Sequence, residues 1–194
     1  FFFAIVFSKM MADDPLQCVR DSCEDVMRRA TDVSIDDAKL KLLAEELAPN
    51  SSFNPPLWKD FEYHFFDEAD EETTVQYILL MDALNFCFWP APTLEYCHLA
   101  GGLKAALARD RHAFDAPRLA SATAEDVRAW VRADIPEAEE RARLVRELGA
   151  VLQTRFGGRA ANLVRAAGRS ARTLVALVTE SLPGFRDAAV YRGR

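Results

Sequence analysis

The run YILLMDALNFCFW, from Tyr77 to Trp89, decides the fold because it is the most apolar stretch of the chain past its first residues. Only two polar residues interrupt it, Asp82 and Asn85. They stand three positions apart, so they would share one face of a helix. A helix that is apolar nearly all round belongs in a protein core. The run therefore predicts a central helix, ended by the prolines that follow it.

The two polar residues of this run have two interpretations. A buried carboxylate or amide needs hydrogen-bond partners, because an unpaired buried charge is costly. With Phe86 and Trp89 beside them, Asp82 and Asn85 could bind the edge of a flat heterocycle while an aromatic ring packs on its face. Alternatively, both side chains bond to neighbouring loops and the helix is only structural.

The length of 194 residues is typical of one domain, and the composition of 50% hydrophobic and 28% charged residues is typical of a globular protein. Residues 1–11, FFFAIVFSKMM, are too short to span a membrane and lack the basic start of a signal peptide. We expect residues 1–11 to be a non-native or unstructured leader and residues 12–194 to form a helical domain. Cytoplasm is the expected compartment, with no membrane association.

The net charge of −6 argues against a general nucleic-acid binder. The charge is uneven, since residues 1–108 carry a net −11 and residues 109–194 a net +5. The basic half could hold a phosphate, or it could be arginine-rich helix surface that docks on the acidic half.

The cysteines and histidines show no metal-ligand spacing. No CxxC pair occurs, and the three histidines do not stand beside the four cysteines at zinc-site intervals. We therefore expect reduced, intracellular thiols and no metal. The residues concerned are Cys18, Cys23, Cys87, Cys97, His64, His98 and His112.

The rest of the chain also reads as mainly helical. Helices are predicted from Leu94 to about Arg109, from a Thr123 cap with Asp126 to Ala133, from Pro136 to the Gly157-Gly158 stop, and from Ser170 to Leu182. The Gly101-Gly102 pair would allow close approach by another helix or a ligand.

Two stretches could be extended. Aromatic residues alternate with other types between Phe61 and Phe65, which suggests a short extended piece. Within it, His64 could be a packing residue or a ligand group. A short strand could begin at residues 188–194. The predicted fold class is all-α.

Several stretches together resemble one family, the queuosine salvage proteins, which are queuosine 5′-phosphate N-glycosylase/hydrolases. Their order and spacing match the family from roughly Cys18 to the last residue. The matching residues are His64-Phe65-Phe66-Asp67, Gln76-Tyr77, Asp82-Ala83-Leu84-Asn85-Phe86-Cys87-Phe88-Trp89, His98-Leu99-Ala100, Gly102-Leu103-Lys104, Phe156-Gly157-Gly158, Ser170-Ala171, Leu174-Val175, Pro183 and Phe185-Arg186-Asp187.

The resemblance implies an all-α fold similar to helical DNA glycosylases. It implies hydrolysis of the N-glycosidic bond of queuosine 5′-phosphate, which releases queuine for reuse in tRNA modification. The expected partner is this small-molecule nucleotide, without direct nucleic-acid binding, and no cofactor is expected. As hypotheses, the substrate-binding residues are His64, Asp82, Asn85, Phe86 and Trp89.

Family members continue past the Phe-Arg-Asp stretch into a Lys-Arg motif and an acidic motif that supply much of their active site. This chain stops at Arg194, so we expect an N-terminal portion of the enzyme in which the family's later part is absent. The catalytic carboxylate is therefore left unassigned, with Asp82 as a candidate. The alternative function is a non-catalytic helical module that binds queuine or a partner without hydrolysis. A DNA glycosylase is disfavoured by the acidic charge.

Overall fold

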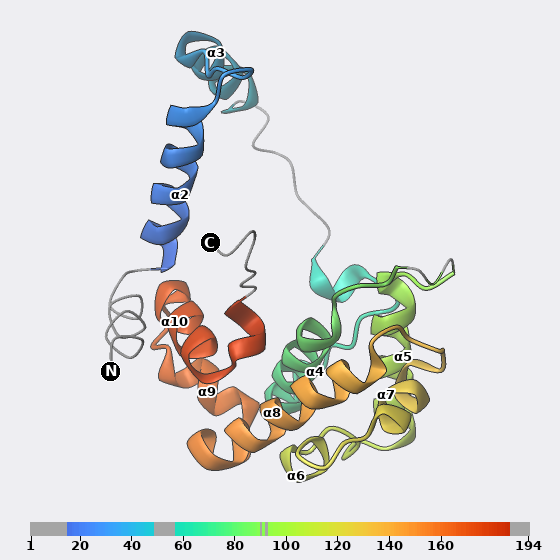
Figure 1. Ribbon diagram of the computed structural model, residues 1–194. Helices are drawn as coiled ribbons and strands as arrows, with labels where there is room; N and C mark the ends of the chain where they lie inside the picture. Colours follow the sequence, from blue (N-terminus) through green and yellow to red (C-terminus); the bar gives the residue numbers. More distant parts are fainter. Residues whose placement is uncertain (1–14, 49–56, 90, 92, 187–194) are drawn as a thin grey trace, which may run out of the picture. The chain divides into compact units, whose positions relative to one another are not determined.

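The structure is a computed structural model that describes residues 15–48, 57–89, 91 and 93–186. It divides the chain into two compact units, Phe1–Leu57 and Trp58–Arg194. Every regular element among the described residues is helical, which confirms the all-α prediction (Figure 1). The expected leader and the possible strand at 188–194 lie outside the described residues, and the domain bounds stay a prediction. No helix in the described ranges is long and apolar enough to cross a membrane.

The described residues of the first unit form the helices α2 (Pro15–Arg29) and α3 (Asp37–Leu47). The side chain of Asp36 accepts a hydrogen bond from the backbone N–H of Lys39 at 3.1 Å. This is the usual way in which an aspartate satisfies a free N–H group at a helix start.

The second unit holds the remaining elements. Two of them, η2 and η3, are single 3₁₀ turns, and the others are α-helices. Their bounds are η2 (Trp58–Asp60), α4 (Glu71–Leu84), α5 (Tyr96–Arg109), α6 (Ala116–Leu119), α7 (Ala124–Val131), α8 (Ala138–Phe156), α9 (Ala160–Ala166), α10 (Ala171–Ser181) and η3 (Pro183–Arg186).

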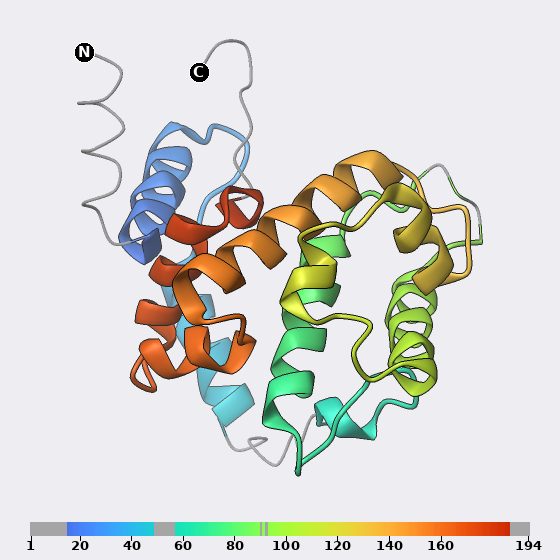
Figure 2. The ribbon, with the colours of Figure 1, turned by 90° about the horizontal axis from the view of Figure 1, so that it is seen from below.

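The core of the second unit forms around α4 and α8. The α8 helix packs against α4, α6, α7 and α9, and it runs from the α7 end of the unit to the α9–α10 end (Figure 2). On α4, Tyr77, Leu80 and Leu84 have no exposed surface. The predicted central helix is therefore confirmed as a core element.

The central helix ends earlier than predicted, at Leu84 instead of Trp89. Asn85 leaves the helical conformation with φ −88° and ψ 66°, and Cys87 has a positive φ of 43°. The last carbonyl groups of a helix lack partners within it, so a helix can end in the core only where something binds them.

The guanidinium of Arg141, on α8, binds these carbonyl groups. It donates hydrogen bonds to the backbone oxygens of Leu84 and Phe86, and to that of Cys87 at 3.0 Å. Its Nε donates to the oxygen of Pro136 at 2.7 Å. Arg141 is fully buried, and burial lowers its pKa to about 10, so it remains charged at neutral pH. This arginine thus joins the end of α4 to the start of α8.

The predicted helix ends elsewhere agree with the structure. The backbone and hydroxyl of Thr123 and the backbone and carboxylate of Asp126 bond reciprocally at the start of α7. Gly157 ends α8 with φ +62°, and the Ser170 hydroxyl caps α10. The predicted helix from Leu94 begins slightly later, at Tyr96.

The extended piece predicted around Phe61–Phe65 is wrong. The chain turns there, with the N–H of His64 donating to the oxygen of Phe61 at 3.0 Å. The indole of Trp58 donates to the oxygen of Phe65 at 3.0 Å, which closes the turn. The aromatic residues alternate because they pack in a cluster, not because they line a strand.

Two glycines let helices approach closely. A Cβ atom at Gly102 would lie 2.7 Å from the Cα of Val131, so α5 meets α7 there, which is one of the two contacts foreseen for the glycine pair. A Cβ atom at Gly149, on α8, would overlap the backbone nitrogen of Ala120 and lie 2.7 Å from the oxygen of Ala116.

Replacing Arg141 with Met should destabilise the fold strongly, because several buried carbonyl groups would lose their donors. We expect a loss of about 3 kcal/mol in the free energy of unfolding, measured by urea denaturation. The control is Arg143→Met on the same helix. Arg143 is exposed and pairs with Glu140 and Glu147, so its loss should cost about 0.5 kcal/mol or less. Equal effects of the two changes would contradict the role given to Arg141.

Gly149→Ala should destabilise the fold by about 2 kcal/mol, since the added methyl group would push α6 from α8. Gly101→Ala is the matched change, because its Cβ atom would meet only the Cβ of Tyr63 at 3.7 Å, an ordinary contact. It should be neutral or stabilising by up to about 1 kcal/mol, as alanine favours a helix over glycine. Thermal denaturation of both variants tests this, and a destabilised Gly101→Ala variant would contradict it.

Candidate functional site

An apolar cavity with one carboxylate is the candidate site. Its volume is about 410 Å³, and it opens between α4, α9, α10 and η3. Most of its lining side chains are aliphatic, with one aromatic ring and two polar groups. The lining residues are Val75, Ile78, Leu79, Asp82, Leu163, Val164, Leu174, Val175, Val178, Thr179 and Phe185.

Asp82 is the only charged residue in this lining. Within the described part of the chain, no side chain or backbone group donates a hydrogen bond to its carboxylate, and no cation pairs with it. The residue stays accessible to solvent, yet enough protein surrounds its carboxyl group for burial to raise the pKa. The carboxylate is therefore free to meet a ligand that offers hydrogen-bond donors or positive charge.

The wall opposite Asp82 is fixed by the start of α4. The carboxylate of Glu72 accepts the backbone N–H groups of Ala160 and Ala161 at 2.6 and 3.2 Å, which satisfies the free start of α9. Glu71 pairs with Arg165 at 2.5 Å. These contacts hold α9 against α4, and α10 packs in turn on α9.

His64 lies in an aromatic cluster with both of its ring nitrogens bonded. Its Nδ1 lies 2.9 Å from the backbone oxygen of Trp58, and its Nε2 lies 2.7 Å from the hydroxyl of Tyr96. A carbonyl only accepts, so Nδ1 carries the proton and Nε2 accepts from the tyrosine. The imidazole also stacks on the Trp58 ring at 3.7 Å. This matches the packing interpretation of His64 more closely than the ligand one.

The hydroxyl of Tyr96, which bonds to His64, has a shifted pKa. Burial raises the pKa of Tyr96, and the negative charge of Asp82 raises it further. Of the predicted site residues, Asp82 lines the cavity and His64 lies in the aromatic cluster, and the role of both in binding stays a prediction.

The other three predicted residues lie elsewhere. Asn85 follows the last residue of α4 and is exposed. The ring of Phe86 packs on the guanidinium of Arg141, with 4.1 Å between the ring centre and Cζ. Trp89 is 83% exposed. None of the three lines the cavity that contains Asp82, and their role in binding stays a prediction.

Sequence reasoning did not single out the cavity wall formed by Leu174, Val178, Thr179 and Phe185. Most of these side chains are apolar, and nothing in an apolar helix face distinguishes a ligand wall from a core. The available signal was the family resemblance, whose matching stretches include Leu174-Val175 and Phe185.

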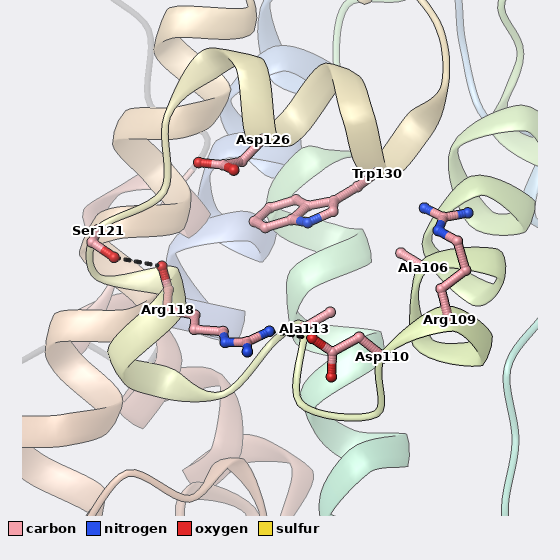
Figure 3. A pocket seen from close by; sticks show the side chains of 8 residues that line it. All are labelled: Ala106, Arg109, Asp110, Ala113, Arg118, Ser121, Asp126 and Trp130. Carbon is pink, nitrogen blue, oxygen red and sulfur yellow. Dashed lines mark hydrogen bonds and ion pairs between the residues drawn. The ribbon is translucent and has the colours of Figure 1, made fainter.

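A second cavity of about 410 Å³ lies at the end of α5 and beside α6 and α7 (Figure 3). Its two carboxylates are already engaged, since Asp110 pairs with Arg118 and Asp126 caps α7. The indole of Trp130 forms part of its wall. Among the described residues no group of three histidines, cysteines or carboxylates could hold a metal ion.

The model of one family, described as queuosine salvage protein, matches residues 63–194. Three relatives carry the name queuosine 5′-phosphate N-glycosylase/hydrolase. The one from Dictyostelium discoideum is 38% identical over 93% of this chain and 59% of its own length. The one from Sphaerobacter thermophilus is 41% identical over 87% of this chain and 54% of its own length. The one from Mus musculus is 30% identical over 90% of this chain and 57% of its own length.

The chain thus spans little more than half the length of these relatives. The family match includes His64 and all the residues that line the Asp82 cavity, with its wall from α9, α10 and η3. Because it extends over most of the sequence, the chain belongs to the queuosine salvage protein family.

Proposed function

We propose that this chain forms the substrate-binding part of an enzyme that hydrolyses the N-glycosidic bond of queuosine 5′-phosphate and releases queuine for tRNA modification. The names of the relatives supply the reaction. The observation that carries the proposal is the apolar cavity with one unpaired carboxylate, which suits a flat heterocycle with hydrogen-bond donors. The proposal includes action in the cytoplasm on a small-molecule nucleotide, without direct nucleic-acid binding.

The chemistry sets what the site must provide. Cleavage builds positive charge on the ribose ring. A nearby carboxylate can stabilise this charge or can direct a water molecule to the ring. Queuine is a 7-deazaguanine, so it lacks the N7 atom that other purine glycosylases can protonate. The enzyme therefore depends more on charge near the sugar and on hydrogen bonds to the edge of the base. We place Asp82 at the substrate and leave the catalytic carboxylate unassigned.

A second candidate is binding without hydrolysis. It is favoured by the lining of the cavity, in which Asp82 is the only acidic or basic side chain among the described residues. In this case the chain would hold queuine or its nucleotide and release nothing.

The direct test is queuine release from queuosine 5′-phosphate, followed by chromatography, by this chain and by one extended to the length of its relatives. Asp82→Asn and His64→Ala should each lower release by about tenfold or more, because one removes a charge at the substrate and the other opens the neighbouring cluster. Asp134→Asn is the control, since this exposed residue pairs with Arg128 and does not line the Asp82 cavity. Unchanged rates in both test variants would overturn this placement. Binding without release by either length would leave the non-catalytic candidate.

Asp82→Asn should also make the fold more stable at neutral pH. Because burial raises the pKa of Asp82, the folded chain holds this proton more tightly than the unfolded chain, so ionisation destabilises the fold. The variant should therefore melt at a higher Tm than the parent at pH 7. The difference should shrink as the pH falls through the raised pKa of Asp82, because the folded parent then binds the proton and no longer carries the buried charge. A lower Tm for the variant at pH 7 would contradict this.

A further inference from the structure

The cavity that contains Asp82 suits the base of a nucleotide and not its phosphate group. A ribose 5′-phosphate needs hydrogen-bond donors or cations around its phosphate oxygens. The described lining offers neither, since Asp82 is negative and the Thr179 hydroxyl donates to the oxygen of Val175 in its own helix at 2.8 Å. A phosphate beside an unpaired carboxylate would be repelled. The part of the substrate that fits here is therefore the base.

The faces and the edge of a planar base find separate partners in this cavity. Aliphatic side chains from α4 and α10, with the ring of Phe185, provide apolar surface for the faces. The volume of about 410 Å³ is large enough for a purine-sized ring system with a substituent. The edge must then meet Asp82, whose ionised carboxylate has two oxygens that only accept hydrogen bonds.

Resting on the proposed function, we propose that the Asp82 carboxylate binds the Watson–Crick edge of a guanine-type base, accepting hydrogen bonds from its N1–H and 2-amino groups. Two parallel hydrogen bonds from adjacent donors match the two oxygens of one carboxylate. An adenine-type edge presents an acceptor at N1, which would face the carboxylate unfavourably. Asp82 is thus a specificity-determining residue that selects 7-deazaguanine bases, and it is not the group at the anomeric carbon.

The geometry also predicts how the selection can be changed. An asparagine at this position keeps one acceptor and gains an N–H₂ donor. It would pair with a base that has N1–H beside a 2-carbonyl group, which is the edge of 7-deazaxanthine. Asp82→Asn should therefore exchange the preference for 7-deazaguanine for a preference for 7-deazaxanthine, and not merely weaken binding.

The experiment measures binding of 7-deazaguanine, 7-deazaxanthine and queuine to this chain by calorimetry, for the parent, Asp82→Asn and the control Asp134→Asn. The parent and the control should bind 7-deazaguanine about tenfold or more tightly than 7-deazaxanthine, and Asp82→Asn should reverse the order. If Asp82→Asn does not fold, the affinities of the parent chain for two bases still test the inference. It should bind 7-deazaguanine about tenfold more tightly than 7-deazahypoxanthine, which lacks the 2-amino group.

Equal binding of 7-deazaguanine by the parent and Asp82→Asn would overturn the inference while the proposed function stands. The inference would also be overturned if Asp82→Asn weakened the binding of queuine but not of 7-deazaguanine. The carboxylate would then bind the ammonium group of the queuine side chain and not the edge of the base. Equal affinity of the parent for 7-deazaguanine and 7-deazahypoxanthine would also overturn it. No binding of any base, together with no queuine release by the extended chain, would reject the proposed function and the inference with it.

Discussion

The guanidinium of Arg141 is the contact on which the arrangement of the second unit depends. It satisfies backbone oxygens at the end of α4 and at the start of α8 with one charged group that has no solvent exposure. A buried charged group is tolerated only when its N–H donors form hydrogen bonds, and here backbone oxygens from two segments accept them. The rings of Phe86 and Phe88 cover the guanidinium with their faces, which adds attraction without needing another anion. The direction in which α4 ends is thereby set by α8.

The candidate cavity follows from this arrangement. With one end of α4 held by Arg141, its first turn reaches α9 through Glu71 and Glu72. Asp82 lies on the stretch of α4 between these two attachments, and the α9–α10 wall stands across from it. The carboxylate is kept in place by its helix and not by partners of its own, which is why it remains free for a ligand. A structural carboxylate would have been expected to accept hydrogen bonds from its neighbours, as Glu72 does.

The sequence predicted local features well and distant contacts poorly. The all-α fold, the central helix and the ends of α7, α8 and α10 depend on patterns within a few residues, and these were confirmed. The early end of α4 depends on Arg141, which stands more than fifty positions away and gives no signal near Leu84. For the same reason Phe86 was expected at a ligand, although its ring packs on this arginine. The sequence marked out Asp82 only because a polar residue interrupts an apolar run there, and its role in binding stays a prediction. The apolar wall opposite could not be told from core.

The bond between Glu72 and the start of α9 has a consequence for how the chain is made. Its two ends are separated by 88 positions, so during synthesis the carboxylate emerges long before the N–H groups that it binds. Closing so large a loop carries an entropy cost that must be met before the contact can stabilise anything. The helices between them can pack earlier, because α5, α6, α7 and α8 find partners among themselves. We therefore expect the candidate cavity, whose wall comes from α9, α10 and η3, to form after α5–α8 have packed.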